Sequence, residues 1–259
     1  MRLLLAAALM ALSVTPAFAY RPFDSTDAAV ADRGVIEFEC GPIGLMVDAR
    51  DRSLIVPAAI LNVGLANGWE VVAESKNFVR VGTAQPQSAR LLDSAISVKK
   101  VLRAGSLQDR SGLSIAFEGS LLLPTGGDGT QAGLGMTGIV SRRFSNATFH
   151  FNGAAILEKD GRWVPASGLI LEGPERWRVR PVGELTVDGW RQRTSSMLVG
   201  GIWQVDEHLA LDAGWRMSSP GGSAVREVRA GFTWGFATSR STSAPTGADA
   251  PSNNQGNGV

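Results

Sequence analysis

Side-chain polarity alternates residue by residue along most of this chain, and the clearest example is the last extended run, Val225–Phe236. Alternate residues of a β-strand share one face of the strand. One face of this run is apolar and the other is polar or small: Val228, Ala230, Phe232, Trp234 and Phe236 against Glu227, Arg229, Gly231 and Thr233. Repeats of this pattern, each about ten residues long, are typical of transmembrane β-barrels, which turn apolar side chains to lipid and polar ones to the lumen.

Turn signals divide the pattern into about twelve segments, and an even number lets both ends of the barrel chain lie on the periplasmic side. The Asn67-Gly68 pair suits a type I′ hairpin turn between the second and third segments. The sequence therefore predicts an all-β fold, a transmembrane antiparallel up-and-down β-barrel over residues 34–236. The segments are Gly34–Met46, Ser53–Leu65, Trp69–Val79, Ala89–Leu102, Leu113–Leu123, Gln131–Arg143, Ala147–Leu157, Arg162–Glu172, Trp177–Val187, Thr194–Val205, His208–Met217 and Ala224–Phe236.

Three further segments flank the barrel. Residues 1–19 have the composition of a signal peptide, with Arg2, an apolar run Leu3–Leu12 and a small-x-small site at Ala17-Phe18-Ala19. We expect cleavage before Tyr20 and export across the inner membrane. Residues 20–33 form a polar lead-in, and residues 237–259 form a Ser/Ala/Pro/Asn/Gly tail that we expect to be disordered. We expect both to lie outside the barrel.

Composition excludes several classes of protein. The formal net charge is +1, so the chain lacks the strong positive field of a nucleic-acid-binding protein. Cys40 is the only cysteine, so an internal disulfide is impossible. After the signal peptide, the sequence has no run of about 18 uncharged apolar residues, which excludes membrane-spanning helices.

The polar faces of the predicted strands carry charged residues that we expect to line the lumen. An acidic wall in the early strands would face a mixed, more basic wall in the later ones: Glu37, Glu39, Glu70, Glu74, Asp93 and Glu118 against Arg143, Arg178, Arg180, Glu184, Asp212, Arg216, Glu227 and Arg229. Two interpretations remain open. The charges either create a transverse field across a water-filled pore or form a salt-bridged lattice that closes a narrow barrel. Under the first interpretation, neutralising Arg178 and Arg180 should change ion selectivity.

Tryptophans lie in or beside the predicted strands, as in the aromatic girdles that mark the two edges of a membrane. Four of them, Trp69, Trp163, Trp177 and Trp190, lie near strand ends, while Trp203, Trp215 and Trp234 complete the set. The alternative is that these rings pack the core of a soluble β-sandwich or lipocalin-like carrier.

Apparent chemical motifs have simpler explanations. Gly133-x-Gly135-x-x-Gly138 matches a dinucleotide-binding fingerprint, but it lies inside an alternating strand and does not open a helix. His150 and Asn152 share a strand face, as in an outer-membrane phospholipase, but a nucleophile would have to come from a neighbouring strand, for example Ser141. The spacing of His, Cys and carboxylates fits no metal site. We therefore expect no catalytic, metal or cofactor site and no enzymatic activity.

The start and end of the barrel region resemble a family of bacterial outer-membrane barrels described as transporters and similar to the phenol-degradation (MetA-pathway) group. The matching parts are Pro22-Phe23-Asp24, Thr26-Asp27, the strand from Gly34, Asn62-x-Gly64-Leu65, Trp69-Glu70 and the closing RAGFTWGF. The resemblance covers about residues 21–236. It implies a barrel fold and an outer-membrane location in a Gram-negative bacterium, and it carries over no catalytic residues.

The sequence thus predicts a porin-like channel or transporter for passive passage of a small solute that the sequence does not identify. Its partners would be outer-membrane lipid and the barrel assembly machinery, with no nucleic acid. The alternatives are a structural or interaction barrel with an occluded lumen and a lipid-acting barrel enzyme. A serine close to His150 would favour the enzyme.

Overall fold

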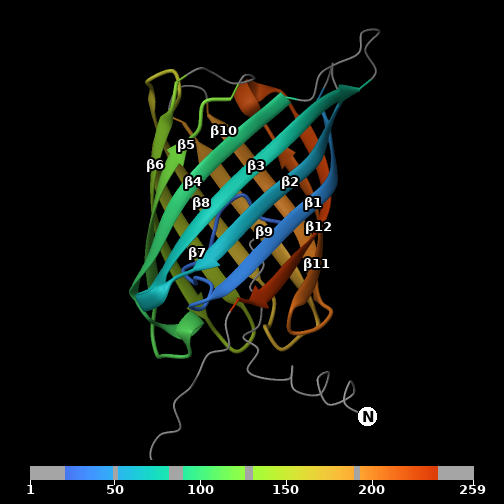
Figure 1. Cartoon of the computed structure of the whole chain (residues 1–259). Coiled ribbons are helices and arrows are strands. Elements are labelled where there is room, and N and C mark those ends of the chain that lie inside the picture. The colour runs from blue at the N-terminus through green and yellow to red at the C-terminus, as the bar shows by residue number, and fades with distance from the viewer. Residues whose placement is uncertain (1–20, 49–51, 82–89, 126–130, 190–192, 239–259) are drawn as a thin grey trace, which may run out of the picture.

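Twelve antiparallel strands close into one barrel in the computed structural model, which describes residues 21–48, 52–81, 90–125, 131–189 and 193–238 (Figure 1). Each strand pairs with its neighbours in sequence, and β1 pairs with β12 to close the barrel. The strands are β1 (Val35–Val47), β2 (Arg52–Gly64), β3 (Trp69–Val81), β4 (Arg90–Arg103), β5 (Ser114–Leu122), β6 (Gly133–Arg143), β7 (Thr148–Leu157), β8 (Trp163–Glu172), β9 (Val179–Asp188), β10 (Thr194–Gln204), β11 (Leu209–Ser218) and β12 (Val225–Ala237).

The predicted fold is confirmed, and each observed strand boundary lies within two residues of the predicted one. Local chemistry accounts for this agreement. In the link between β2 and β3, Asn67 and Gly68 both have positive φ values, 61° and 70°, as a type I′ turn requires. The glycines of the apparent dinucleotide fingerprint lie within β6, so they belong to the barrel wall.

Alternate side chains of each strand face outward and inward, and the outward set is strongly apolar. In β7, burial alternates regularly along Thr148–Asn152. Six tryptophans expose between 37% and 59% of their surface on the outside: Trp69, Trp163, Trp177, Trp203, Trp215 and Trp234. Trp190 lies outside the described residues. This exterior is the opposite of a soluble protein's and matches a lipid-facing belt.

The two ends of the barrel are distinguished by the links between strands that each end carries. We call the end where β1 begins and β12 ends the proximal end. It also carries the links β2–β3, β4–β5, β6–β7, β8–β9 and β10–β11, while the remaining links lie at the distal end.

No helix among the described residues is long and apolar enough to cross a membrane.

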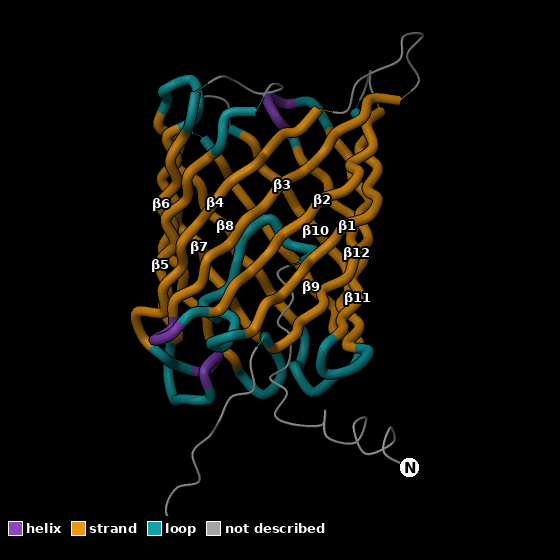
Figure 2. Tube along the Cα trace, viewed as in Figure 1, coloured by secondary structure: helices purple, strands orange, loops and turns teal. Residues whose placement is uncertain are grey.

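Residues Arg21–Arg33 lie inside the barrel, and this corrects the expectation that the lead-in lies outside it. We call this segment the N-terminal strap. Figure 2 shows it as an irregular tube within the cylinder of strands. Its position follows from hydrogen bonds to the inner faces of strands as distant in sequence as β3 and β12. The predicted signal peptide and most of the predicted tail lie outside the described residues. The first residue assigned to the tail, Ala237, belongs to β12.

Candidate binding site in the barrel lumen

The N-terminal strap follows the inner wall of the barrel almost once around. Arg21 contacts Asp212 on β11 and the Ala230 carbonyl on β12. The strap then passes β9, β7 and β6, reaches β3, and enters β1 from the proximal end. A segment of thirteen residues therefore occupies the proximal half of the lumen.

The wall holds the strap mainly through the backbone of the strap. Glu39 accepts the N–H of Arg21 at 3.1 Å, and Glu70 accepts the N–H of Ala31 at 2.8 Å. Glu184 accepts two consecutive N–H groups, those of Asp24 at 2.9 Å and Ser25 at 2.7 Å. Carboxylates bind backbone N–H groups more strongly than neutral acceptors do. These wall glutamates thus satisfy backbone donors that would otherwise lie unpaired inside the barrel.

Polar side chains complete the backbone contacts. Asn152 accepts the N–H of Thr26 at 3.3 Å and donates to the carbonyl of the same residue at 2.7 Å. Ser141 accepts the N–H of Ala28 at 3.0 Å. With these two hydrogen bonds, Asn152 pairs with the main chain of the strap much as a neighbouring strand would.

Glycines on the inner wall give the strap room to approach. A Cβ atom at Gly64 would lie 2.1 Å from the carbonyl oxygen of Asp32, and one at Gly168 would lie 2.0 Å from Ser25 Oγ. The contact at Gly64 is with backbone, so this position accepts only glycine while the strap is in place, whereas a side chain at Gly168 would require Ser25 to shift.

Two small apolar clusters anchor the strap between its polar contacts. Phe23 packs against Val182, Ile202 and Ala210, which face inward from β9, β10 and β11. Ala28 and Ala29 pack with an inward cluster: Leu107, Ala116 and Ile139. The strap therefore buries apolar surface as well as satisfying its hydrogen bonds.

Asp24 anchors the strap through ion pairs with two arginines. Its carboxylate accepts a hydrogen bond from Arg229 at 2.9 Å and pairs with Arg216 Nε at 2.8 Å. Burial alone would raise the pKa of Asp24. The charges of Arg229, Lys76 and Arg216, and the hydrogen bond from Arg229, outweigh burial and hold the pKa below its ordinary value.

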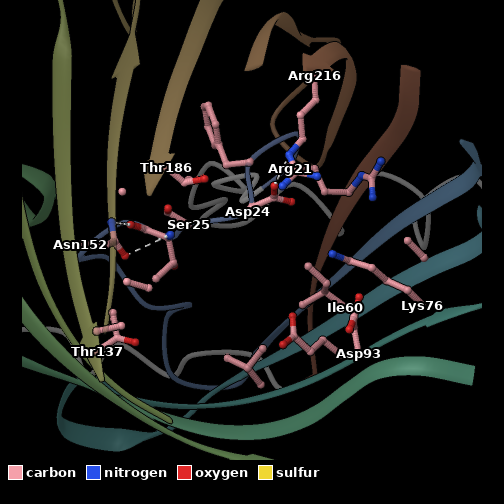
Figure 3. Close-up of a pocket in the computed structure, with 18 of the residues that line it drawn as sticks. Arg21, Asp24, Ser25, Ile60, Lys76, Asp93, Thr137, Asn152, Thr186 and Arg216 are labelled. Carbon is pink, nitrogen blue, oxygen red and sulfur yellow. Dashed lines mark hydrogen bonds and ion pairs between the residues drawn. The ribbon is translucent and has the colours of Figure 1, made fainter. Parts of the chain in front are cut away.

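A cavity of about 530 Å³ lies between the strap and the distal end (Figure 3). Strap residues from Phe23 to Thr26 line it on the strap side. Its walls combine charged side chains with apolar ones: Lys76, Arg216, Arg229, Glu74, Asp93, Glu118, Asp188 and Glu227 with Ile55, Ile60, Val72, Phe78 and Ile156. A cavity of this size and mixed lining is typical of sites for small organic molecules.

The structure distributes the predicted lumen residues over four places. Glu39, Glu70, Glu184, Asp212, Arg216 and Arg229 contact the strap. Glu74, Asp93, Glu118, Glu227, Arg216 and Arg229 line the cavity. Glu37 and Arg180 are buried on the inner wall, and Arg180 Nε lies 3.8 Å from Glu172. Arg143 and Arg178 lie at the proximal end.

The two proximal arginines contact links between strands. Arg143 pairs with Asp109 and Glu175, each of which belongs to a proximal link. Arg178 is exposed, precedes β9 and donates to the Val205 carbonyl at 2.9 Å. Arg178 thus lies at the rim because β9 begins one residue later, at Val179.

Several residues of the site escaped the sequence analysis. Lys99 is fully buried and donates to Thr26 Oγ1 at 3.1 Å. Alternation with Ser97 placed it on the polar face of its strand, so this signal was present. Asp24, Lys76 and Asn62 are the other additions. Nothing in the composition of residues 20–33 distinguishes a segment inside the lumen from one outside.

Ser141 lies beside His150, as the barrel-enzyme alternative required. Its Oγ is 2.9 Å from His150 Nδ1, and His150 Nε2 is 3.2 Å from Glu172 Oε1. However, Ser141 and His150 are only 1% and 2% exposed, and Ser141 is bonded to the strap. All three residues face the lumen, so membrane lipid cannot reach them. Their geometry fits a docking surface for the strap better than a lipid-acting site.

The described residues contain no group of three or more His, Cys, Asp or Glu side chains that could hold a metal ion. Charged side chains of the wall contact the strap or line the cavity. Of the two interpretations left open by the sequence, a narrowed lumen fits the proximal half, but the strap narrows it rather than a lattice of wall charges alone.

Comparison with known proteins gives structural relatives only. A scan against protein-family models found no match, and a search of curated proteins found none. Among solved structures, the chain is similar to the COG4313 outer membrane channel from Pseudomonas putida F1, with a TM-score of 0.62, 9% identity, and coverage of 83% of this chain and 100% of that one. The NanC porin has a TM-score of 0.55 at 8% identity, covering 77% and 98% of the two chains. The KdgM porin in complex with disordered oligogalacturonate has a TM-score of 0.54 at 11% identity, covering 78% and 99%. At these identities, the likeness establishes the fold.

Proposed function

We propose that this chain is a passive channel for small molecules in the outer membrane of a Gram-negative bacterium, narrowed at its proximal end by its own N-terminal strap. The observation that carries the proposal is a closed barrel with an apolar exterior and a polar interior that holds a cavity of about 530 Å³. Similar architecture in solved porins and an outer membrane channel supports it.

We extend this to the location of the channel and to its partners. Export would depend on the signal peptide at residues 1–19, and insertion would involve the barrel assembly machinery and outer-membrane lipid. Both ends of the barrel chain lie at the proximal end. Because the chain ends of outer-membrane barrels lie on the periplasmic side, the proximal end would face the periplasm. Membership of the MetA-pathway barrel group is part of the same proposal and rests on the sequence resemblance.

We also propose that the channel is not an enzyme. The lumen places Ser141 and His150 beneath the strap, where the serine hydroxyl accepts the N–H of Ala28. A nucleophilic serine needs a free approach for its substrate. A structural barrel with an occluded lumen is the alternative, and the strap is the observation that favours it.

Single-channel conductance in a planar bilayer separates these two functions. The full mature chain would be compared with a variant lacking residues 21–33. We expect stepwise conductance from the deletion variant and smaller or rarer steps from the full chain, because the strap fills the proximal lumen. A heat-sensitive gel shift would verify that each barrel has folded.

A deletion of thirteen residues within 239–259 serves as the matched control and should behave like the full chain. A deletion variant that folds but stays silent would contradict the channel and support the structural barrel.

A further inference from the structure

Two arginines contact the carboxylate of Asp24, and Lys76 acts on it through charge. Arg229 donates from its NH1 group to Oδ1 at 2.9 Å, and Arg216 places its Nε 2.8 Å from Oδ2. Figure 3 shows Arg216 directed toward Asp24 and Lys76 entering the cavity from the side of β3. Paired guanidinium groups are the usual protein ligands for a carboxylate.

Lys76 borders the same space and is available to a ligand. It lines the cavity, and no hydrogen bond or ion pair engages its amine within the described part of the chain. A β-bulge lies between Glu74 and Lys76 in the pairing of β3 with β4. Glu74, Ser75 and Lys76 all line the cavity, so this irregular stretch of β3 turns consecutive side chains toward it.

Acidic groups also face this cluster and limit what it can bind. Glu227 pairs with both arginines, at 3.5 Å from Arg216 and 2.9 Å from Arg229. Glu74 and Asp188 act through charge on Lys76 and Arg216. A second negative charge on a ligand would meet these carboxylates. The cluster therefore favours an anion with a single charge.

Apolar walls adjoin the cluster. Ile55, Ile60, Val72, Phe78 and Ile156 line the cavity, and Phe23 lies on the strap side. A molecule whose carboxylate met Arg216, Arg229 and Lys76 could bury an apolar body against these side chains.

We infer that Arg216, Arg229 and Lys76 form a binding site for small amphipathic monocarboxylates, and that Asp24 occupies this site as an internal substitute for the ligand. A ligand carboxylate would displace that of Asp24 without loss of charge pairing at the arginines. The strap would then lose its ionic anchor. This inference deepens the proposed channel function and rests on it for its biological meaning, although the binding itself is independent of conductance.

The test uses three probes that share one ring and differ in charge: benzoate, benzamide and benzylamine. Binding to the full folded chain in detergent micelles would be measured by isothermal titration calorimetry. Asp24→Asn removes the competing charge at nearly constant volume. We expect it to bind benzoate at least about tenfold more tightly than the wild-type chain, with no such gain for benzamide or benzylamine. Adding Arg216→Gln to Asp24→Asn should abolish the gain.

Asp160→Asn is the matched control. Asp160 is an exposed carboxylate in the link between β7 and β8, paired with Arg162 and outside the cavity lining, so its substitution should leave benzoate affinity unchanged. If Asp24→Asn does not fold, Lys76→Gln in the wild-type chain replaces it and should weaken benzoate binding. Equal benzoate affinity in the wild-type and Asp24→Asn chains would overturn the site, and so would a gain for benzylamine.

The same probes in the bilayer separate the two proposals. Binding of benzoate by a barrel that never conducts, even without residues 21–33, would leave the site standing and refute the channel. Conductance from the strap deletion without a benzoate gain in Asp24→Asn would refute the site and leave the channel standing. If both hold, benzoate should raise the open fraction of the full chain, and benzamide should not.

Discussion

Asp24 keeps its negative charge inside the barrel because the cations beside it more than offset its burial. A carboxyl whose pKa is lowered in the folded state stabilises that state at every pH above its ordinary value, near 3.9. This contribution falls only as the pH drops below that value and through the lower pKa of the folded state. The ionic anchor of the strap is therefore insensitive to mild acid.

Mild acidification should leave the ionic anchor at Asp24 intact. We expect the ratio of the open fractions of Asp24→Asn and the full chain in single-channel records to be the same at pH 7 and pH 5. Asp24→Asn, which lacks the ionic anchor at every pH, should open more often across the same range. A ratio that changes between pH 7 and pH 5 would contradict this assignment.

At the scale of the elements, the strap depends on β9 more than on any single ion pair. Glu184 accepts two adjacent N–H groups, and hydrogen bonds to charged groups contribute about 1.5–3 kcal/mol each. Removing this side chain leaves two buried donors to be satisfied by water or not at all.

Glu184→Ala should therefore raise the ratio of open to closed states at least about tenfold, which corresponds to about 1.4 kcal/mol. Single-channel recording of the folded variant measures this ratio. Glu158→Ala is the control because Glu158 lies in the distal link between β7 and β8 and pairs there with Arg162. An unchanged ratio in Glu184→Ala would show that the remaining contacts suffice to seat the strap.

The elements also show what sequence reasoning could and could not provide. Each strand was predictable because alternation and turn residues are local signals, as at Asn67-Gly68. The strap was not, because its place depends on acceptors such as Glu70 and Glu184, which lie far away in sequence. These glutamates lie on the polar faces of their strands, but their partners are backbone groups, which every residue carries. Gly64 and Gly168 are glycines because the strap lies against them, but this reason is visible only in the tertiary structure.

At the scale of the whole molecule, the apolar exterior forms a belt of exposed side chains, as expected of a surface that faces lipid. Val199 lies at the middle of β10 and is 48% exposed, opposite the exposed Trp215 on β11. A charge at this depth would have to leave water for hydrocarbon. The belt is therefore the part of the surface that is most sensitive to polar substitution.

Val199→Arg should destabilise the barrel by about 2–4 kcal/mol in a bilayer, as expected for a basic residue near the midplane. Urea titration of tryptophan fluorescence in lipid vesicles would measure the loss. Lys159→Arg, a change in the distal link, should leave stability unaltered. A neutral result for Val199→Arg would mean that this part of β10 does not face hydrocarbon.

Because the wall holds the strap largely by its main chain, many substitutions in the strap should be tolerated during evolution. Glu39, Glu70, Glu184, Asn152 and Ser141 all accept main-chain N–H groups. Any amino acid except proline offers such a donor. Selection on the strap is thus concentrated on side chains with contacts of their own, such as Arg21, Asp24 and Thr26, and on a few small or aromatic positions. Among natural variants of this barrel, the acceptor residues of the wall should accordingly be more conserved than the amino-acid sequence of the strap.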